Sequence, residues 1–239
     1  WMLNPITLYA IFAWGAIDII PAFFSISALY LAQKNHGLWA CLLLGIGASF
    51  KVYPFLMLLP LCLICFSTQK TRIKALILGL LPFVITILPF ISDKNFIVHF
   101  FSSDQLQIIQ HASFYIGREQ NISIFYIFYV TLLIFLYRNK LSVKYLTWIF
   151  FLIMFLFYAL SAFTPQWFVW GLPFLLLILV ENNLSIKWYI SILLIYFLLV
   201  ILFEVTLNLG LLAPVDNSFL EYPSAGELVS RFFNVDRLN

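Results

Sequence analysis

Charged residues are scarce in this chain. Asp, Glu, Lys and Arg together make up 10% of its 239 residues, whereas 64% are hydrophobic. Soluble globular domains carry about 25% charged and about 45–50% apolar residues. So few charges cannot cover the surface of a soluble fold of this length. The composition therefore excludes a cytosolic enzyme, a disulfide-stabilised secreted scaffold and a disordered chain, and it predicts an integral membrane protein.

Groups that serve nucleic-acid or metal binding are also sparse. The 13 Lys and Arg residues form no basic tract, so a nucleic acid is not expected as a partner. The sequence contains no Asp-x-Asp, Asp-Asp or Glu-Asp pair. Cys41, Cys62 and Cys65 lie inside apolar runs without a nearby His or acid, which indicates packing. No cofactor is evident, and a divalent metal is possible but has no support in these residues.

The apolar residues form long continuous runs without period-two alternation, which predicts an all-α membrane protein. We expect one multi-span domain over residues 1–239 with about eight transmembrane or half-membrane helices. The predicted helices cover 15–33, 37–50, 53–66, 72–91, 121–137, 144–162, 165–181 and 186–210. The second and third of these are too short for a ~30 Å hydrocarbon core and are separated by Pro54, so they are predicted to form a short hairpin.

The loops between the predicted helices differ in charge. Eight of the 13 basic residues, but a single acid, lie in the loops 34–36, 67–71, 138–143 and 182–185 and their flanks. Cytoplasmic loops are enriched in Lys and Arg, so these loops are predicted to be cytoplasmic. The loop 92–120 and the tail 211–239 are then external. Because the chain begins Trp1-Met2, we expect it to be the C-terminal part of a longer protein, in a prokaryotic plasma membrane or, in a eukaryote, the endoplasmic reticulum.

Ionisable residues at membrane depth cost at least ~2.5–3.5 kcal/mol, so the few present are candidates for function. Asp18 either lines an external cavity, where it pairs with a cation or a substrate hydroxyl, or orients the first turn of a helix. Lys51 either binds an anionic lipid phosphate or extends to the headgroups. Arg118, in the external loop, either binds a phosphate or pairs with Glu119.

A further external turn contains Gln166, Trp167 and Trp170. These residues either form an interfacial aromatic belt or hold a sugar ring by stacking and hydrogen bonds. Lys51, Arg118 and Gln166 all lie at the external ends of predicted helices. We therefore expect them to converge on one cavity that opens outward.

Four sequence blocks resemble those of GT-C-type membrane glycosyltransferases, in particular the glycosylphosphatidylinositol mannosyltransferase I type and its prokaryotic relatives. The blocks are Asn4-Pro5 with Trp14-Gly15-Ala16-Ile17-Asp18, Phe50-Lys51-Val52-Tyr53-Pro54, Arg118 with Asn121-Ile122-Ser123, and Pro165-Gln166-Trp167-Phe168-Val169-Trp170. They follow one another in the family's order over residues 4–170. All four lie on the predicted external side.

The resemblance implies a GT-C-like helical bundle and an inverting hexosyl transfer. The sugar, expected to be mannose, moves from a polyprenyl- or dolichyl-phosphate donor to a lipid-linked or surface glycan acceptor, among membrane lipids. The donor-binding residues it implies are Asn4, Asp18, Lys51, Tyr53, Arg118 and Gln166. The family's acidic catalytic motif precedes the Asn-Pro block, so the catalytic residue is expected upstream of residue 1. The alternatives are a lipid or polysaccharide transporter (flippase) and a structural subunit; transport is disfavoured because the polar groups cluster near one face.

Overall fold

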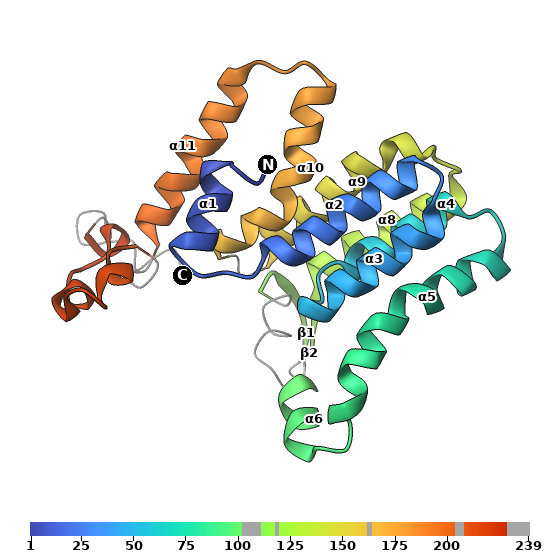
Figure 1. The fold of residues 1–239 in the computed structure, drawn as a ribbon, viewed down its shortest axis with the longest axis horizontal. Helices are drawn as coiled ribbons and strands as arrows, with labels where there is room; N and C mark the ends of the chain where they lie inside the picture. The colour runs from blue at the N-terminus through green and yellow to red at the C-terminus, as the bar shows by residue number, and fades with distance from the viewer. Residues whose placement is uncertain (102–110, 118–119, 162–163, 204–207, 229–239) are drawn as a thin grey trace. The chain divides into compact units, whose positions relative to one another are not determined.

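The computed structural model describes residues 1–101, 111–117, 120–161, 164–203 and 208–228 (Figure 1). Most of these residues are helical, as the apolar runs predict. The chain divides into two compact units. We call them the large unit (Ile17–Ile178) and the terminal unit (Trp1–Ala16 with Leu179–Asn239).

The large unit is built from helices, short 3₁₀ turns and a two-stranded ribbon. In chain order its elements are α2 (Ile19–Gln33), α3 (Gly37–Phe50), α4 (Phe55–Cys65), α5 (Gln69–Ile87), η1 (Leu88–Phe90), α6 (Lys94–Phe101), β1 (Ser113–Gly117), β2 (Gln120–Ser123), α8 (Ile124–Arg138), η2 (Val143–Tyr145), α9 (Leu146–Leu160), η3 (Pro165–Trp167) and α10 (Phe168–Glu181), whose last residues pass into the terminal unit. The predicted break at Pro54 is confirmed, because α3 ends at Phe50 and α4 begins at Phe55.

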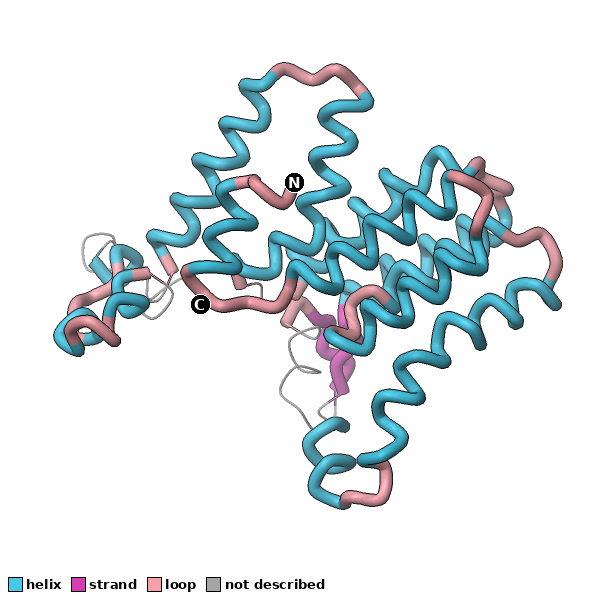
Figure 2. Tube along the Cα trace, viewed as in Figure 1, coloured by secondary structure: helices cyan, strands magenta, loops and turns pink. Residues whose placement is uncertain are grey.

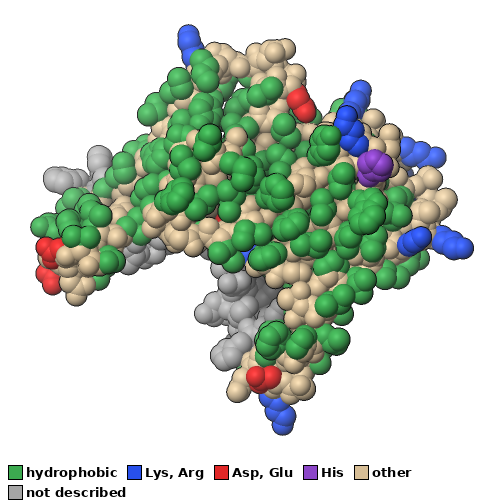
Figure 3. Space-filling model, in the orientation of Figure 1, with side chains coloured by type: hydrophobic (Ala, Val, Ile, Leu, Met, Phe, Trp, Pro, Cys, Tyr) green, Lys and Arg blue, Asp and Glu red, His purple; other side chains and the backbone are tan. Residues whose placement is uncertain are grey.

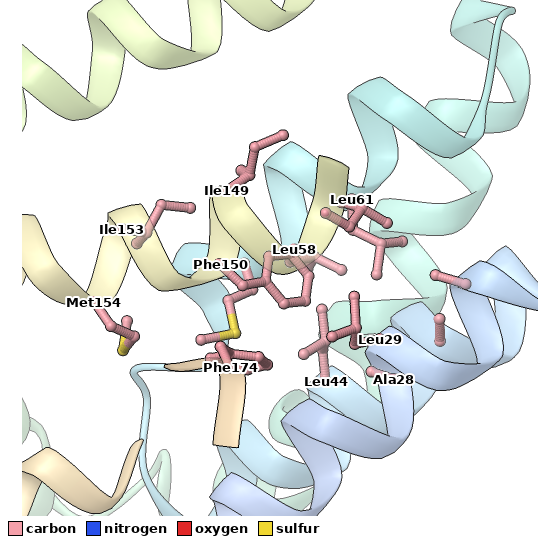
Figure 4. Packing of buried hydrophobic residues seen from close by; sticks show 14 of the residues in the cluster. Ala28, Leu29, Leu44, Leu58, Leu61, Ile149, Phe150, Ile153, Met154 and Phe174 are labelled. Atoms are coloured by element: carbon pink, nitrogen blue, oxygen red, sulfur yellow. The ribbon is translucent and has the colours of Figure 1, made fainter. Parts of the chain in front are cut away.

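The core of the large unit lies where α2, α3, α4, α9 and α10 meet (Figure 4). Leu29, Leu44 and Leu58 from the first three helices face Phe150 and Phe174 from the last two. The two phenylalanine rings pack edge to face, with their centroids 5.5 Å apart, the arrangement favoured by the charge distribution of aromatic rings. This packing fixes the ends of α2, α3 and α10, which carry the candidate site.

Helices α3 and α5 pack closely through two glycines. A Cβ atom added at Gly45 would collide with the backbone carbonyl oxygen of Gly79. Small residues permit such backbone contact, which is a common means of helix association in membranes. The contact depends on the absence of a side chain at position 45.

Two helical segments are long and apolar enough to cross a membrane, by length and composition: Gln69–Phe90 with 22 residues and Val143–Leu160 with 18. The remaining apolar helices among the described residues have 10–17 residues. The structure thus bears out a mostly helical, apolar chain, whereas the predicted number of eight spans is not supported by helix length. In Figure 3 hydrophobic side chains cover the sides of the helices, and most visible Lys and Arg side chains project near helix ends.

The segment 92–120, predicted to be an external loop, contains regular structure in its described part. It holds α6, and β1 pairs with β2 in an antiparallel ribbon, drawn in magenta in Figure 2. The prediction of an all-α fold is therefore incomplete at this point. The strand Ser113–Gly117 is short but contains Phe, Tyr and Ile, which favour extended backbone.

The terminal unit contains α1 (Pro5–Phe12), α11 (Ile186–Leu202), η5 (Leu209–Leu212) and η6 (Asn217–Leu220). Helix α1 was not among the predicted helices, although Asn4 and Pro5 form a recognisable helix start. The Asn4 side chain accepts a hydrogen bond from the Ile6 N–H and donates one to the Tyr189 hydroxyl at 2.8 Å. The ring of Tyr9 contacts Trp14 and Phe197, which joins α1 to α11.

Candidate functional site

An ion pair joins the start of α2 to the end of α3. Asp18 directly precedes α2 and Lys51 directly follows α3. The two helices lie side by side (Figure 1) and are connected by three residues, so the start of one meets the end of the other. The Lys51 Nζ atom lies 2.6 Å from Asp18 Oδ1. The side chain of Asp18 is 3% exposed and that of Lys51 is 32% exposed, so the carboxylate is buried and the ammonium is accessible from one side.

The carboxylate of Asp18 has a second partner on a distant helix. The indole N–H of Trp170, in α10, donates a hydrogen bond to Asp18 Oδ1 at 2.5 Å. The Lys51 ammonium lies 5.3 Å from the centre of the Trp170 ring, a distance that permits a cation–π interaction. Asp18 makes no side-chain capping hydrogen bond to α2. Asp18 thus pairs with a cation, Lys51, while it also stands at the N-terminus of α2, so its effect on the first helical turn through its charge stays a prediction.

Aromatic rings pack beside the ion pair. Tyr53 stacks on Trp170 with ring centres 4.2 Å apart and planes 6° apart, and Trp167 stacks on Trp170 at 5.2 Å. Trp170 is 5% exposed, so it has little free face to offer a sugar ring. Trp167 is only half-buried and keeps that possibility.

The hydroxyl of Tyr53 is buried and interacts with the side chain of Ser25, although the two groups do not form a hydrogen bond of good geometry. Tyr53 belongs with the ion pair and Trp170 to a cluster that we call the Asp18 cluster: Asp18, Lys51, Tyr53 and Trp170.

The Asp18 cluster determines which ligands could bind here. Its two charges cancel, and an ammonium is a compact charge with three N–H donors. An anion can approach Lys51 from its exposed side. To bind tightly, the anion has to compete with Asp18 for the ammonium.

The other predicted site residues have different positions. Gln166 lies in η3, four residues before Trp170, and is half-buried. Asn4 belongs to the terminal unit, where both of its side-chain groups serve the start of α1 and the contact with Tyr189. Arg118 lies outside the described residues, so the expected convergence of Lys51, Arg118 and Gln166 on one cavity stays a prediction.

Trp170 is the member of the Asp18 cluster whose role the sequence did not indicate. It was expected to contribute to an aromatic belt or a sugar contact, but it hydrogen-bonds to a residue 152 positions away in the sequence. Within the described residues no group of three or more His, Cys, Asp and Glu is arranged to hold a metal ion. Cys41 and Cys62 lie in the core with their sulfur atoms 3.7 Å apart.

Comparison with known proteins gives a family match over part of the chain. No curated protein and no solved structure matches the chain. A family model covers about a third of the sequence, including α2, α3, α4 and α5 with both members of the ion pair. Over residues 11–92 the chain matches the Mannosyltransferase (PIG-M) family, which confirms there the resemblance that the sequence blocks indicate.

Proposed function

We propose that the chain is part of a membrane mannosyltransferase that uses a polyprenyl- or dolichyl-phosphate mannose donor. The acceptor is a lipid-linked or surface glycan, and the reaction takes place at the external face of the membrane. The observation that carries the proposal is the Asp18–Lys51 ion pair, which lies within the family match and contacts Trp170 from a separate sequence block.

Lys51 has the properties needed at the donor phosphate. During transfer the bond between the anomeric carbon and the phosphate oxygen breaks, and an acceptor oxygen forms the new bond from the opposite side, which inverts the anomeric centre. The departing phosphate gains negative charge. An ammonium fixed nearby in a poorly solvated site stabilises that charge as it develops. Charge-assisted contacts contribute about 1.5–3 kcal/mol, or roughly one to two orders of magnitude in rate.

Asp18 is a poor candidate for the catalytic base that takes the acceptor proton. Its carboxylate is buried and already engaged by Lys51 and Trp170. In this proposal the base is an acidic residue N-terminal to the present sequence, with or without a divalent metal. The described residues then contribute donor binding and stabilisation of the leaving phosphate.

The apolar composition and the charge of the loops support the proposed location. With the basic loops in the cytoplasm, the turn that contains Lys51 and the turn that contains Gln166 both face outward. A lipid-linked donor then reaches Lys51 from the outer leaflet. The membrane is the plasma membrane in a prokaryote and that of the endoplasmic reticulum in a eukaryote.

A transfer assay with the intact protein in vesicles tests this function. The donor is radiolabelled polyprenyl-phosphate mannose and the acceptors are membrane glycolipids of the source cell. We expect label in the acceptor without any nucleotide sugar. The control is the double variant Asp18→Asn with Lys51→Met, which removes both charges together and is expected to lose at least about tenfold in rate. Transfer from a nucleotide sugar alone, or label that crosses the membrane uncleaved as in a flippase, would overturn the proposal.

A further inference from the structure

The ion pair creates a difficulty for a phosphate ligand at Lys51. Its ammonium is already neutralised by Asp18 at 2.6 Å. A site intended only to bind phosphate tightly would leave the ammonium without a competing carboxylate. The arrangement therefore weakens phosphate binding, and the chemistry of the proposed reaction suggests why this is useful.

The charge of the lipid phosphate increases during transfer. The donor is a phosphodiester with one negative charge, whereas the product, a lipid phosphomonoester, carries about −1.5 to −2 charges at neutral pH. A cation that stabilises the departing phosphate therefore binds the product more strongly than the donor. Without a competing group, the product would remain on the enzyme.

We propose that Asp18 is a positioning residue that recaptures Lys51 and so promotes release of the lipid-phosphate product. This inference rests on the proposed function. Before the donor binds, the Lys51 ammonium is paired with Asp18. When the donor is bound, the ammonium contacts the phosphate instead. As the product leaves, the ammonium forms the ion pair with Asp18 again.

The burial of Asp18 provides the driving force for recapture. Its side chain is 3% exposed, so it cannot turn toward water when Lys51 contacts a phosphate. A buried charge without its partner is strongly unfavourable. The complex with product contains this unpaired carboxylate and is therefore less stable. When the product leaves, Lys51 pairs with Asp18 again and the unfavourable free energy is removed.

Trp170 and Tyr53 limit this penalty. The Trp170 N–H hydrogen-bonds to Asp18 independently of Lys51, so the carboxylate keeps one donor when the ammonium moves away. Tyr53 stacks on Trp170 and so helps to hold the indole ring in the position from which its N–H reaches Asp18. The two aromatic side chains thus set how readily the ammonium can change partners.

Product inhibition of the intact enzyme measures this effect. Initial rates are measured with polyprenyl-phosphate mannose, with and without added polyprenyl monophosphate. For Asp18→Asn we expect the inhibition constant of the monophosphate to fall by about tenfold or more, the KM of the donor to fall less, and kcat to fall. A phosphatase that removes the monophosphate should restore the rate of this variant.

The variant Trp170→Phe provides a test in the opposite direction. It retains an aromatic ring but removes the N–H that stabilises Asp18 without Lys51. The ammonium should then be held more firmly by Asp18, so the inhibition constant of the monophosphate should rise severalfold. Gel filtration in detergent shows whether Asp18→Asn folds. If it does not, Trp170→Phe alone tests whether Asp18 promotes product release.

The outcomes separate this inference from the function on which it rests. If the wild-type protein does not transfer mannose from the lipid-phosphate donor, the proposed function fails. If it does, but neither variant alters the ratio of the monophosphate inhibition constant to the donor KM, then Asp18 has only a structural role and the inference is wrong. A purely structural role would reduce kcat without changing that ratio.

Discussion

Removing the charge of Lys51 alone should destabilise the protein far more than removing both charges of the Asp18–Lys51 pair. Loss of one partner of a fully buried ion pair costs about 3–5 kcal/mol, because the remaining charge is left uncompensated. In Lys51→Met the remaining charge is Asp18, with a side chain that is 3% exposed. The Trp170 N–H still stabilises this carboxylate and Lys51 itself was 32% exposed. We therefore expect a smaller cost of about 2–3 kcal/mol.

Removing the charge of Asp18 instead of that of Lys51 should destabilise the protein less. In Asp18→Asn the ammonium can extend its flexible chain toward water or lipid headgroups, and the Asn side-chain oxygen can still accept from Trp170. We expect a cost of about 1 kcal/mol. The double variant leaves no unpaired charge, so its stability should return close to that of the wild type. Because the two single changes together cost about 3–4 kcal/mol and the double variant costs close to none, the interaction energy between the two sites should be about 3–4 kcal/mol.

Thermal unfolding of the four proteins in one detergent, followed by a fluorescent thiol or dye probe, measures this cycle. The expected order of midpoints is wild type and double variant highest, Asp18→Asn next and Lys51→Met lowest. If the cost of the double variant equals the sum of the costs of the two single changes, the charges are not coupled, and the electrostatic argument for the site is refuted. Equal midpoints for Lys51→Met and the double variant would show that neutralising Asp18 does not relieve the cost of losing Lys51, which would also contradict the argument.

Three further predictions concern the packing, the Tyr53 hydroxyl and the topology. Gly45→Leu should destabilise the protein by about 1–3 kcal/mol, because α3 and α5 can no longer touch. As a control, Leu81→Ala at an exposed position of α5 should shift the thermal midpoint little. Equal effects of the two changes would contradict the close contact between the helices. Tyr53→Phe should change the thermal midpoint little, because the lost hydroxyl interacts with the Ser25 side chain without a hydrogen bond of good geometry; a large fall would show that this interaction stabilises the protein. In a cysteine-free background, a cysteine at Lys140 should react only with reagents that enter the cytoplasm and one at Asn95 with impermeant external reagents; the opposite pattern would reverse the topology.

The positions of most helices could be predicted from the sequence, because long apolar runs and proline breaks are local signals. The prediction for 37–50 coincides with α3, and that for 53–66 differs from α4 by one or two residues at each end. The predicted helix 186–210 extends beyond α11, which ends at Leu202. Hydropathy alone gave no reason to end that helix early. The β1–β2 ribbon was missed because two short strands carry too little periodicity to stand out within a polar loop.

The candidate site could be predicted only in part, for a different reason. Asp18 and Lys51 were recognised because charges are rare in an apolar chain, and a short connection between α2 and α3 is enough to bring them together. The contact with Trp170 depends on how α10 packs in the core, far along the sequence. No local pattern specifies that contact. Asp18 makes no side-chain cap because its own backbone is already helical, with φ −58° and ψ −20°, whereas capping residues adopt extended backbone.

The ion pair also links the lengths of two helices. Helix α2 has 15 residues and α3 has 14, or roughly 22 and 21 Å at ~1.5 Å per residue. A single residue inserted into either helix would shift its end by about 1.5 Å and rotate the charged side chain by about 100° around the axis. The two charges would then no longer meet. An insertion or deletion in α2 can therefore be accommodated only by a matching change in α3, so the two helices must vary in length together.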